Sequence, residues 1–169
     1  MPQFSDHDPP SIDNATQESA VWPTPQVAAL FDKHFSSSEN SLLARSFKKT
    51  AFAAGEILWH EGEPAGDRML LISAGYVKLS SRRPDFHMPI VHAVLGPPSV
   101  FGVETLFLDE PSIYTAQCVT DIEALFMQRS AFEHISHAQP ILSNRFMQKL
   151  FSLCLHRQRA TCQRLMAFF

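Results

Sequence analysis

Two short stretches of the chain place glycine beside acidic residues at spacings that could bind a negatively charged group. The first, Gly55-Glu-Ile-Leu-Trp-His-Glu-Gly-Glu-Pro64, predicts a strand closed by a glycine turn. The second, Phe101-Gly-Val-Glu-Thr-Leu106, predicts a glycine-led turn that opens a short helix. Because the first N–H groups of a helix lack partners within the helix, such a turn can present backbone donors to an anion.

Strands must position these two stretches. Apolar segments of strand length, separated by glycine, proline or polar turns, run through the middle of the chain. They are Met69–Ser73, Tyr76–Leu79, Pro89–Leu95, Tyr114–Val119 and Ile122–Met127, and residues 81–86 form a polar hairpin tip between two of them. We therefore expect a mostly β fold with flanking helices, a jelly roll or β-roll of about eight strands with one helix N-terminus facing inward.

The segment before the strands predicts a tail and then helices. Residues 1–25 contain five prolines among many polar residues, a composition that predicts a disordered tail. Pro25 to Ser46 predicts one or two short helices, with Ser41 as a cap.

Two helices are expected after the strands. Ser130 is the expected N-cap of a helix over Ala131–His137, with Glu133 completing a capping box. Pro140 suits the first turn of a long helix that runs to Phe169. Its apolar face is wide enough to pack on the roll and on a partner helix. That face includes Phe146, Met147, Leu150, Phe151, Leu153, Cys154 and Leu165.

Composition narrows the class of protein. With 169 residues, 45% of them hydrophobic, the chain can bury one good core. A formal net charge of −3 gives no general attraction to nucleic acid or acidic membranes. The start lacks the pattern of a secretory signal and no apolar run has transmembrane length, so a cytoplasmic protein without a membrane partner is expected. No nucleotide-binding loop, esterase elbow or zinc-protease motif occurs, so no enzyme is expected.

The paired stretches resemble the cyclic nucleotide-binding domain of the CRP/FNR transcription regulators, from about Phe31 onward. The resemblance implies a β-roll domain over residues 26–139 and a dimerisation helix over 140–169. It also implies an effector-sensing and dimerisation module that acts as a homodimer and meets DNA only through a helix-turn-helix, which is absent from this chain. The expected dimer interface consists of Phe146, Leu150, Leu153 and Cys154.

The resemblance also implies a ligand pocket, and this chain departs from the family in it. The family uses Phe-Gly-Glu-x-x-Leu and then Arg-Ser-Ala or Arg-Thr-Ala to hold a cyclic phosphate and ribose. Here Val103 stands at the ribose-binding glutamate, with Glu104 adjacent, and Tyr114 stands at the phosphate-binding arginine. A tyrosine hydroxyl cannot neutralise a phosphate, so tight cAMP or cGMP binding is not expected. The expected pocket contains Phe101, Gly102, Val103, Glu104, Thr105, Leu106, Tyr114, Thr115, Ala116 and, from the long helix, Arg157.

The identity of an effector stays open from the sequence. The stretch Asp109–Gln117 is similar to the FNR and denitrification-regulator branch, which suggests a small effector in place of cAMP. Haem is not expected, because none of the eight histidines stands out as an axial ligand, and no cysteine precedes Cys118, which excludes the N-terminal iron–sulfur cluster of some relatives. No metal site is predicted. The alternative is a protein-interaction module that has no ligand and acts through its long helix.

Overall fold

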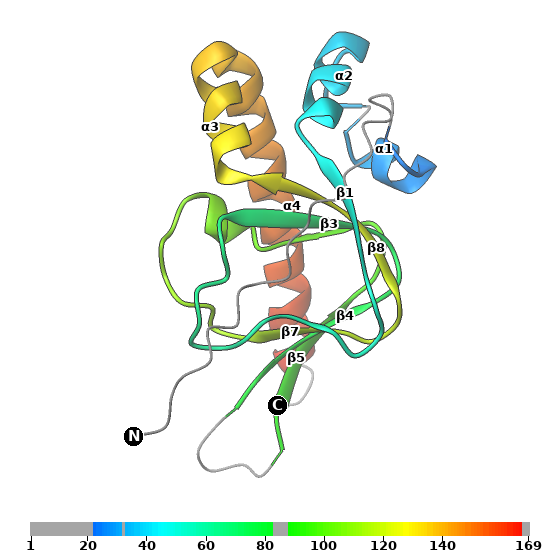
Figure 1. Cartoon of the computed structure of the whole chain (residues 1–169), viewed down its shortest axis with the longest axis vertical. Helices are drawn as coiled ribbons and strands as arrows, with labels where there is room; N and C mark the ends of the chain where they lie inside the picture. The colour runs from blue at the N-terminus through cyan, green and yellow to red at the C-terminus, as the bar shows by residue number, and fades with distance from the viewer. Residues whose placement is uncertain (1–21, 32, 83–87, 167–169) are drawn as a thin grey trace, which may run out of the picture.

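The computed structural model describes residues 22–31, 33–82 and 88–166 of the chain. The first two helices, α1 (Pro25–Phe31) and α2 (Ser37–Arg45), precede the strands. Eight strands follow, and α3 (Arg129–Ala138) and α4 (Pro140–Met166) end the described part of the chain. Figure 1 shows α3 and the start of α4 standing on one side of the roll, with α4 continuing across it. The predicted mostly β fold with a long C-terminal helix is confirmed.

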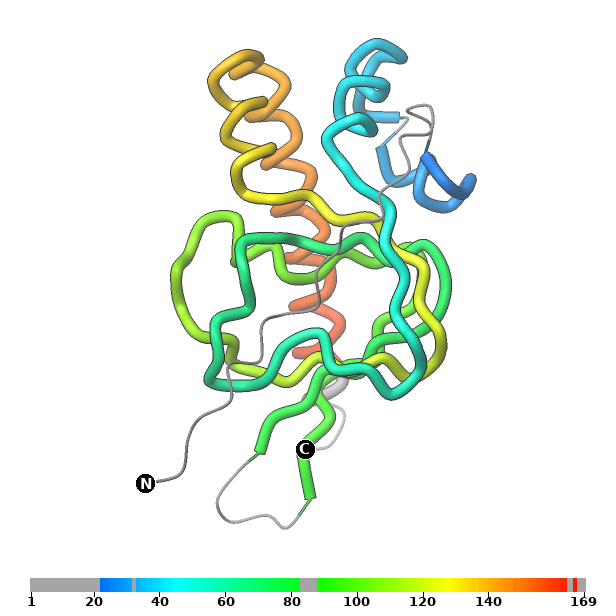
Figure 2. Tube along the Cα trace, in the orientation of Figure 1, coloured from blue at the N-terminus to red at the C-terminus, as the bar shows by residue number. Residues whose placement is uncertain are grey.

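The strands form two four-stranded sheets. The first has the order β1-β8-β3-β6 and the second the order β2-β7-β4-β5. All pairs of neighbouring strands are antiparallel. Figure 2 shows β4 and β5 projecting together from the closed part of the roll. The strand bounds are β1 Lys48–Phe52, β2 Ile57–Trp59, β3 Arg68–Ala74, β4 Val77–Ser81, β5 Ile90–Leu95, β6 Ser99–Phe101, β7 Thr115–Cys118 and β8 Ile122–Gln128.

The first sheet is apolar on both faces because each face covers a different core. Successive side chains of a strand point to opposite faces. In β3, Leu70 and Ile72 enter the core between the two sheets, whereas Met69 and Leu71 enter a second core beneath the helices. Strand β8 divides its apolar residues between the same two cores. This arrangement explains why β3 and β8 are almost continuous apolar runs.

The helix core includes the start of the described chain. Trp22 is buried and its ring stacks on Phe31, with 4.7 Å between the ring centroids. It also packs edge-on against Phe47. The predicted tail over residues 1–25 therefore extends too far, because Trp22 is anchored and α1 begins at Pro25. Residues 1–21 and the hairpin tip at 83–86 lie outside the described residues.

Two predicted helix caps are wrong. Helix α2 begins after Ser36, whose hydroxyl accepts from the N–H of Glu39 at 3.3 Å while its own N–H donates to the Glu39 carboxylate at 2.8 Å. Ser41 lies inside this helix. Ser130 also lies inside a helix, because β8 passes directly into α3 and Gln128 is the N-cap residue, without a side-chain cap.

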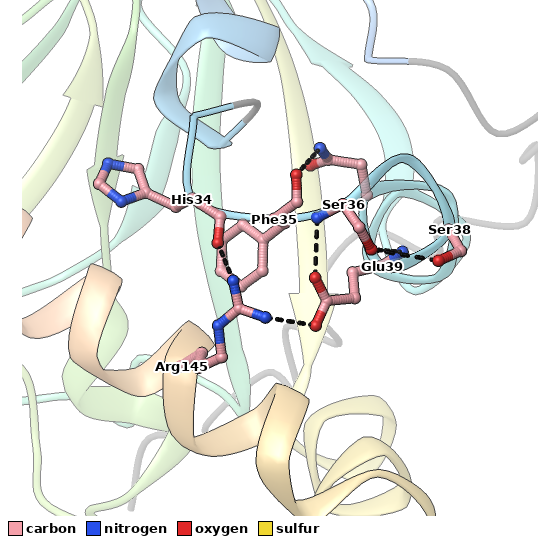
Figure 3. A network of polar contacts seen from close by, with 7 residues as sticks. His34, Phe35, Ser36, Ser38, Glu39 and Arg145 are labelled. Carbon is pink, nitrogen blue, oxygen red and sulfur yellow. Dashed lines mark hydrogen bonds and ion pairs between the residues drawn. The ribbon is translucent and has the colours of Figure 1, made fainter.

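An arginine of α4 fastens the loop between α1 and α2. Figure 3 shows the Arg145 guanidinium between the carbonyl of His34 and the carboxylate of Glu39. The guanidinium pairs with Glu39 at 2.5 Å and lies 5.3 Å above the ring of Phe35. The Ser36 N–H and this arginine hold the pKa of Glu39 below its usual value. The start of α4 is thus tied to the N-terminal helices by polar contacts as well as by its core.

Helix α4 has one buried stripe and one exposed stripe. Leu142, Phe146 and Leu150 recur every four residues and are no more than 4% exposed in the single chain. This burial corrects the expectation that Phe146 and Leu150 face a partner, because both belong to the protomer's own core. Leu153 and Cys154 are half-buried against that core. Among the α4 side chains that the structure describes, the large apolar residues that are exposed are Ile141, Met147, Phe151, Leu155 and Met166.

Candidate functional site

The glycine-led turn lies between β6 and a short 3-10 helix, η1 (Val103–Leu106). Gly102 has φ +69°, a left-handed conformation that side chains disfavour. A Cβ at this position would lie 3.1 Å from the Trp59 ring and 3.3 Å from the carbonyl oxygen of Arg68. The Thr105 hydroxyl closes the turn by donating to the Gly102 carbonyl at 2.8 Å. The fold therefore requires glycine at position 102, both for the backbone conformation and because a side chain would lack space.

A cavity of about 300 Å³ lies beside this turn. Four of the predicted site residues line it, namely Glu104 and Thr105 of η1, Tyr114 before β7 and Arg157 of α4. The remaining lining residues come from the loops and were not predicted as site residues. They are Ala65, Leu108, Glu110, Pro111, Ser112 and Ile113. Segments that are far apart in the sequence thus meet at one concave site, which α4 closes on one side.

The other predicted site residues do not line this cavity, and their side chains pack in the cores or hold neighbouring backbone. Phe101, Leu106 and Ala116 are buried in the two cores. Thr115 uses its hydroxyl to accept from the N–H of Glu61 at 3.1 Å. Val103 is 8% exposed and packs in the helix core, so it does not line the cavity. Of these two adjacent residues, it is therefore Glu104, one residue further along the chain, that lines the cavity.

Glu104 and Tyr114 are joined across the site. The Tyr114 hydroxyl donates to a carboxylate oxygen of Glu104 at 2.5 Å. Burial, and then the charge of Glu104, raise the pKa of Tyr114 well above its usual value, so the phenol stays protonated at neutral pH. A neutral phenol bonded to a carboxylate occupies the position where the resembling family has a phosphate-binding arginine.

The positive charge at the cavity comes from α4. Arg157 donates from Nη1 to the carbonyl oxygen of Val100 at 2.8 Å, which ties α4 to β6. Among the residues that the structure describes, no ion pair joins Arg157 to Glu104 or Glu110. A guanidinium has five N–H donors, so this contact leaves most of them for a ligand or for water.

Aromatic side chains fill the interior of the roll behind Tyr114. The Trp59 ring is 5% exposed, and its centroid lies 5.2 Å from that of Phe101 and 6.2 Å from that of Tyr114. Its indole N–H is buried without a hydrogen-bond partner among the described residues. Trp59 packs in the core between the two sheets, and it does not line the cavity.

Arg129 anchors the cavity loop and has no counterpart in the predicted site. At the start of α3, its guanidinium donates to the carbonyl oxygens of Thr105 and Leu108 and pairs with Asp109 at 2.5 Å. A single side chain therefore holds both the end of η1 and the loop that follows it. The available signal was the position of Arg129 at the junction between a strand and a helix, which does not identify its partners.

Two kinds of feature are absent from the described residues. No group of three or more histidine, cysteine, aspartate or glutamate side chains within them is placed to hold a metal ion. No helix among them has both the length and the apolar character needed to cross a membrane.

Residues 49–139 match the cyclic nucleotide-binding domain family, and this range includes the glycine turn, Glu104 and Tyr114. The chain belongs to that family. It is 30% identical over 108 residues to the CRP-like cAMP-activated global transcriptional regulator of Mycobacterium tuberculosis, covering 64% of this chain and 47% of the relative. The chain thus spans about half the length of the curated relatives that it matches.

Solved structures share the fold. A cyclic nucleotide-binding domain from Methylobacillus flagellatus superposes with a TM-score of 0.77 at 21% identity, covering 85% of this chain and 83% of that one. The catabolite activator protein of Thermus thermophilus gives a TM-score of 0.66 at 22% identity, covering 82% of this chain and 62% of that one. The resemblance to CRP-type regulators is confirmed.

Proposed function

We propose that this chain is the effector-sensing and dimerisation module of a CRP/FNR-type transcription regulator that binds cAMP and cGMP weakly or not at all. It acts in the cytoplasm, and its role is regulatory and not catalytic. The observation that carries the ligand part is the hydrogen bond from Tyr114 to Glu104 at the phosphate position. The fold, the family and the similarity to CRP-type regulators support the rest.

The charge of the site explains the expected weak binding. A cyclic phosphate here would meet the carboxylate of Glu104 and a neutral phenol where a bidentate arginine would otherwise neutralise it. Hydrogen bonds to charged groups contribute about 1.5–3 kcal/mol each, so the loss of even one of the two bonds of a bidentate contact lowers affinity by roughly tenfold to a few hundredfold. Arg157 is the only guanidinium among the residues that line the cavity.

Calorimetric titration with cAMP and cGMP tests this statement. For the unmodified chain we expect the Kd for each nucleotide to lie above about 100 µM, because the phosphate-binding arginine is missing. Tyr114→Arg combined with Glu104→Gln should raise cAMP affinity at least tenfold, because it supplies a guanidinium and removes the competing carboxylate. Tyr76→Arg with Glu133→Gln makes the same charge change at exposed positions and should have no effect. Sub-micromolar cAMP binding by the unmodified chain would contradict the proposal.

The proposed homodimer uses the exposed stripe of α4. Met147, Phe151 and Leu155 lie four residues apart and are 38%, 65% and 41% exposed. Apolar side chains aligned on one helix face favour pairing with a second helix. Cys154 lies beside this stripe and can contribute with the part of its surface that remains accessible, whereas Leu153, two residues from both Phe151 and Leu155, lies on the buried side of the helix.

Sedimentation velocity tests the dimer. Phe151→Glu should shift the chain to monomer while the circular dichroism spectrum stays unchanged. Val94→Glu changes an apolar residue of similar exposure on β5 and should leave the dimer intact. A Phe151→Glu chain that remains dimeric would exclude this face.

DNA recognition belongs, on this proposal, to a helix-turn-helix outside these 169 residues, so the 169-residue chain should not shift operator DNA specifically.

A further inference from the structure

The cavity beside η1 is lined by side chains of opposite charge that, within the described part of the chain, form no ion pair with one another. Glu104 and Glu110 contribute two carboxylates and Arg157 contributes one guanidinium. No ion pair within the described residues joins Arg157 to either glutamate, although all three side chains line the same space. Opposite charges that share a cavity without touching are suited to a ligand that carries both signs.

Each charged group retains unused capacity to bind a ligand. Tyr114 donates to one oxygen of Glu104, which leaves the second oxygen as an acceptor. Arg157 uses one nitrogen for the Val100 carbonyl, so its other N–H groups can donate to a carboxylate. Glu110 adds a second carboxylate, so a cationic group is favoured over a second anionic group at the acidic side.

The size and the walls of the cavity limit the ligand. Its volume is about 300 Å³, and Leu108, Pro111 and Ile113 supply apolar wall. Extension into the roll is blocked, because Trp59 and Phe101 fill the space behind Tyr114. A small ligand with an apolar body fits these limits better than one that inserts a purine between the sheets.

We propose that this cavity binds a small zwitterion, a free α-amino acid, with its ammonium group on Glu104 and Glu110 and its carboxylate on Arg157. This inference rests on the proposed function, because it names the effector class of the same site. The apolar walls favour an aliphatic or aromatic side chain over a charged one. The Tyr114 hydroxyl positions the Glu104 carboxylate that receives the ammonium group.

Thermal unfolding of the 169-residue chain with each of the twenty protein amino acids at 20 mM tests the inference. A ligand at about ten times its Kd raises the Tm of a domain of this size by roughly 3–6 °C. We expect such a shift from at least one apolar amino acid. Its N-acetyl derivative, which lacks the cation, and its methyl ester, which lacks the anion, should each lose most of the shift at the same concentration.

Matched variants place the binding at this cavity. Glu104→Gln and Arg157→Gln should each reduce the affinity at least tenfold, measured as the ligand concentration that gives the same Tm shift. Glu133→Gln and Arg159→Gln make the same changes at exposed positions outside the cavity and should retain the full shift. The inference is overturned if no amino acid raises the Tm, if the N-acetyl derivative acts as strongly as the free amino acid, or if the cavity variants respond as the controls do.

A cAMP titration in the same assay separates this inference from the proposed function. If neither cAMP nor any amino acid shifts the Tm, the zwitterion inference fails while the statement of weak cAMP binding holds. If cAMP produces a large shift at micromolar concentration, the ligand part of the proposed function fails as well.

Discussion

Phe146 and Phe151 lie five residues apart on α4, and the structure gives them opposite roles. Phe146 is 0% exposed, and its ring centroid lies 6.0 Å from that of Phe31, 6.3 Å from that of Phe47 and 6.5 Å from that of Phe132. Phe151 is 65% exposed. Truncating the first to alanine opens a cavity in a closed aromatic cluster, whereas truncating the second removes only solvent-exposed surface from the single chain.

The two alanine substitutions should therefore lower the folding stability by very different amounts. A buried phenylalanine replaced by alanine costs about 3–5 kcal/mol. At roughly 2–4 °C per kcal/mol for a chain of this length, Phe146→Ala should lower the Tm by about 6–20 °C. Phe151→Ala should change the free energy of unfolding of the single chain by no more than about 0.5 kcal/mol, which is a shift of about 2 °C or less.

The assay is thermal unfolding followed by circular dichroism over a hundredfold range of protein concentration. The Tm of a dimer rises with concentration, whereas that of a monomer does not. Phe146→Ala should lower the Tm at every concentration and keep the concentration dependence. Phe151→Ala should weaken the concentration dependence, and it should lower the Tm only at concentrations at which the unmodified chain is dimeric. A Phe146→Ala chain that melts within 2 °C of the unmodified chain but no longer dimerises would refute the assignment of Phe146 to the core.

Arg129→Ala removes the hydrogen bonds to the carbonyls of Thr105 and Leu108. It should lower the Tm by roughly 3–12 °C and speed hydrogen exchange over residues 103–108. The control Arg45→Ala, at the exposed end of α2, should change neither the Tm nor the exchange rate. Ellman's reagent at pH 8 should modify exposed Cys162 quickly and buried Cys118 only after unfolding, and Cys162→Ser should remove the fast phase. Burial raises the pKa of Cys118 from 9.0 to about 11, so the folded state holds this proton more tightly and stability should fall between about pH 9 and pH 11. Cys118→Ala should flatten that part of a plot of Tm against pH, and an unchanged slope would show that this thiol does not contribute.

Strand positions could be predicted because the local sequence carries their boundaries. Glycine, proline and polar turns separate the apolar segments, and the five strands with predicted limits, β3, β4, β5, β7 and β8, begin and end within one or two residues of those limits. No limits were predicted for β1 or β6. The error at Ser130 has a tertiary cause. The N–H of Arg129 bonds to the carbonyl of Asp67 at 2.6 Å, so the chain passes from β8 into α3 without a free cap position. A capping pattern in the sequence cannot reveal that competing partner.

The sequence predicted only part of the site, because packing decides which side chain of η1 faces the cavity. Of the residues expected at the site, Glu104, Thr105, Tyr114 and Arg157 line one cavity. The sequence motif did not show which of two adjacent residues of η1, Val103 or Glu104, faces the cavity. Val103 packs into the helix core, and this leaves Glu104 facing the cavity. Adjacent residues on so short a helix differ mainly in what surrounds them, and the surroundings come from β3, α3 and α4.

Helix α4 illustrates why apolar spacing alone misplaced the expected interface. Residues four apart share a helix face, and moving one residue along the helix turns that face by about 100°. The stripe through Phe146 and Leu150 is therefore distinct from the stripe through Phe151 and Leu155, although both have the same spacing. Arg157 lies two residues beyond Leu155 and reaches the cavity, where it holds the Val100 carbonyl. A ligand carboxylate that binds Arg157 must compete with or reinforce this contact. It therefore acts just beyond the C-terminal end of the exposed stripe and on the opposite face of the same helix, so the helix itself connects the proposed effector site to the proposed dimer face.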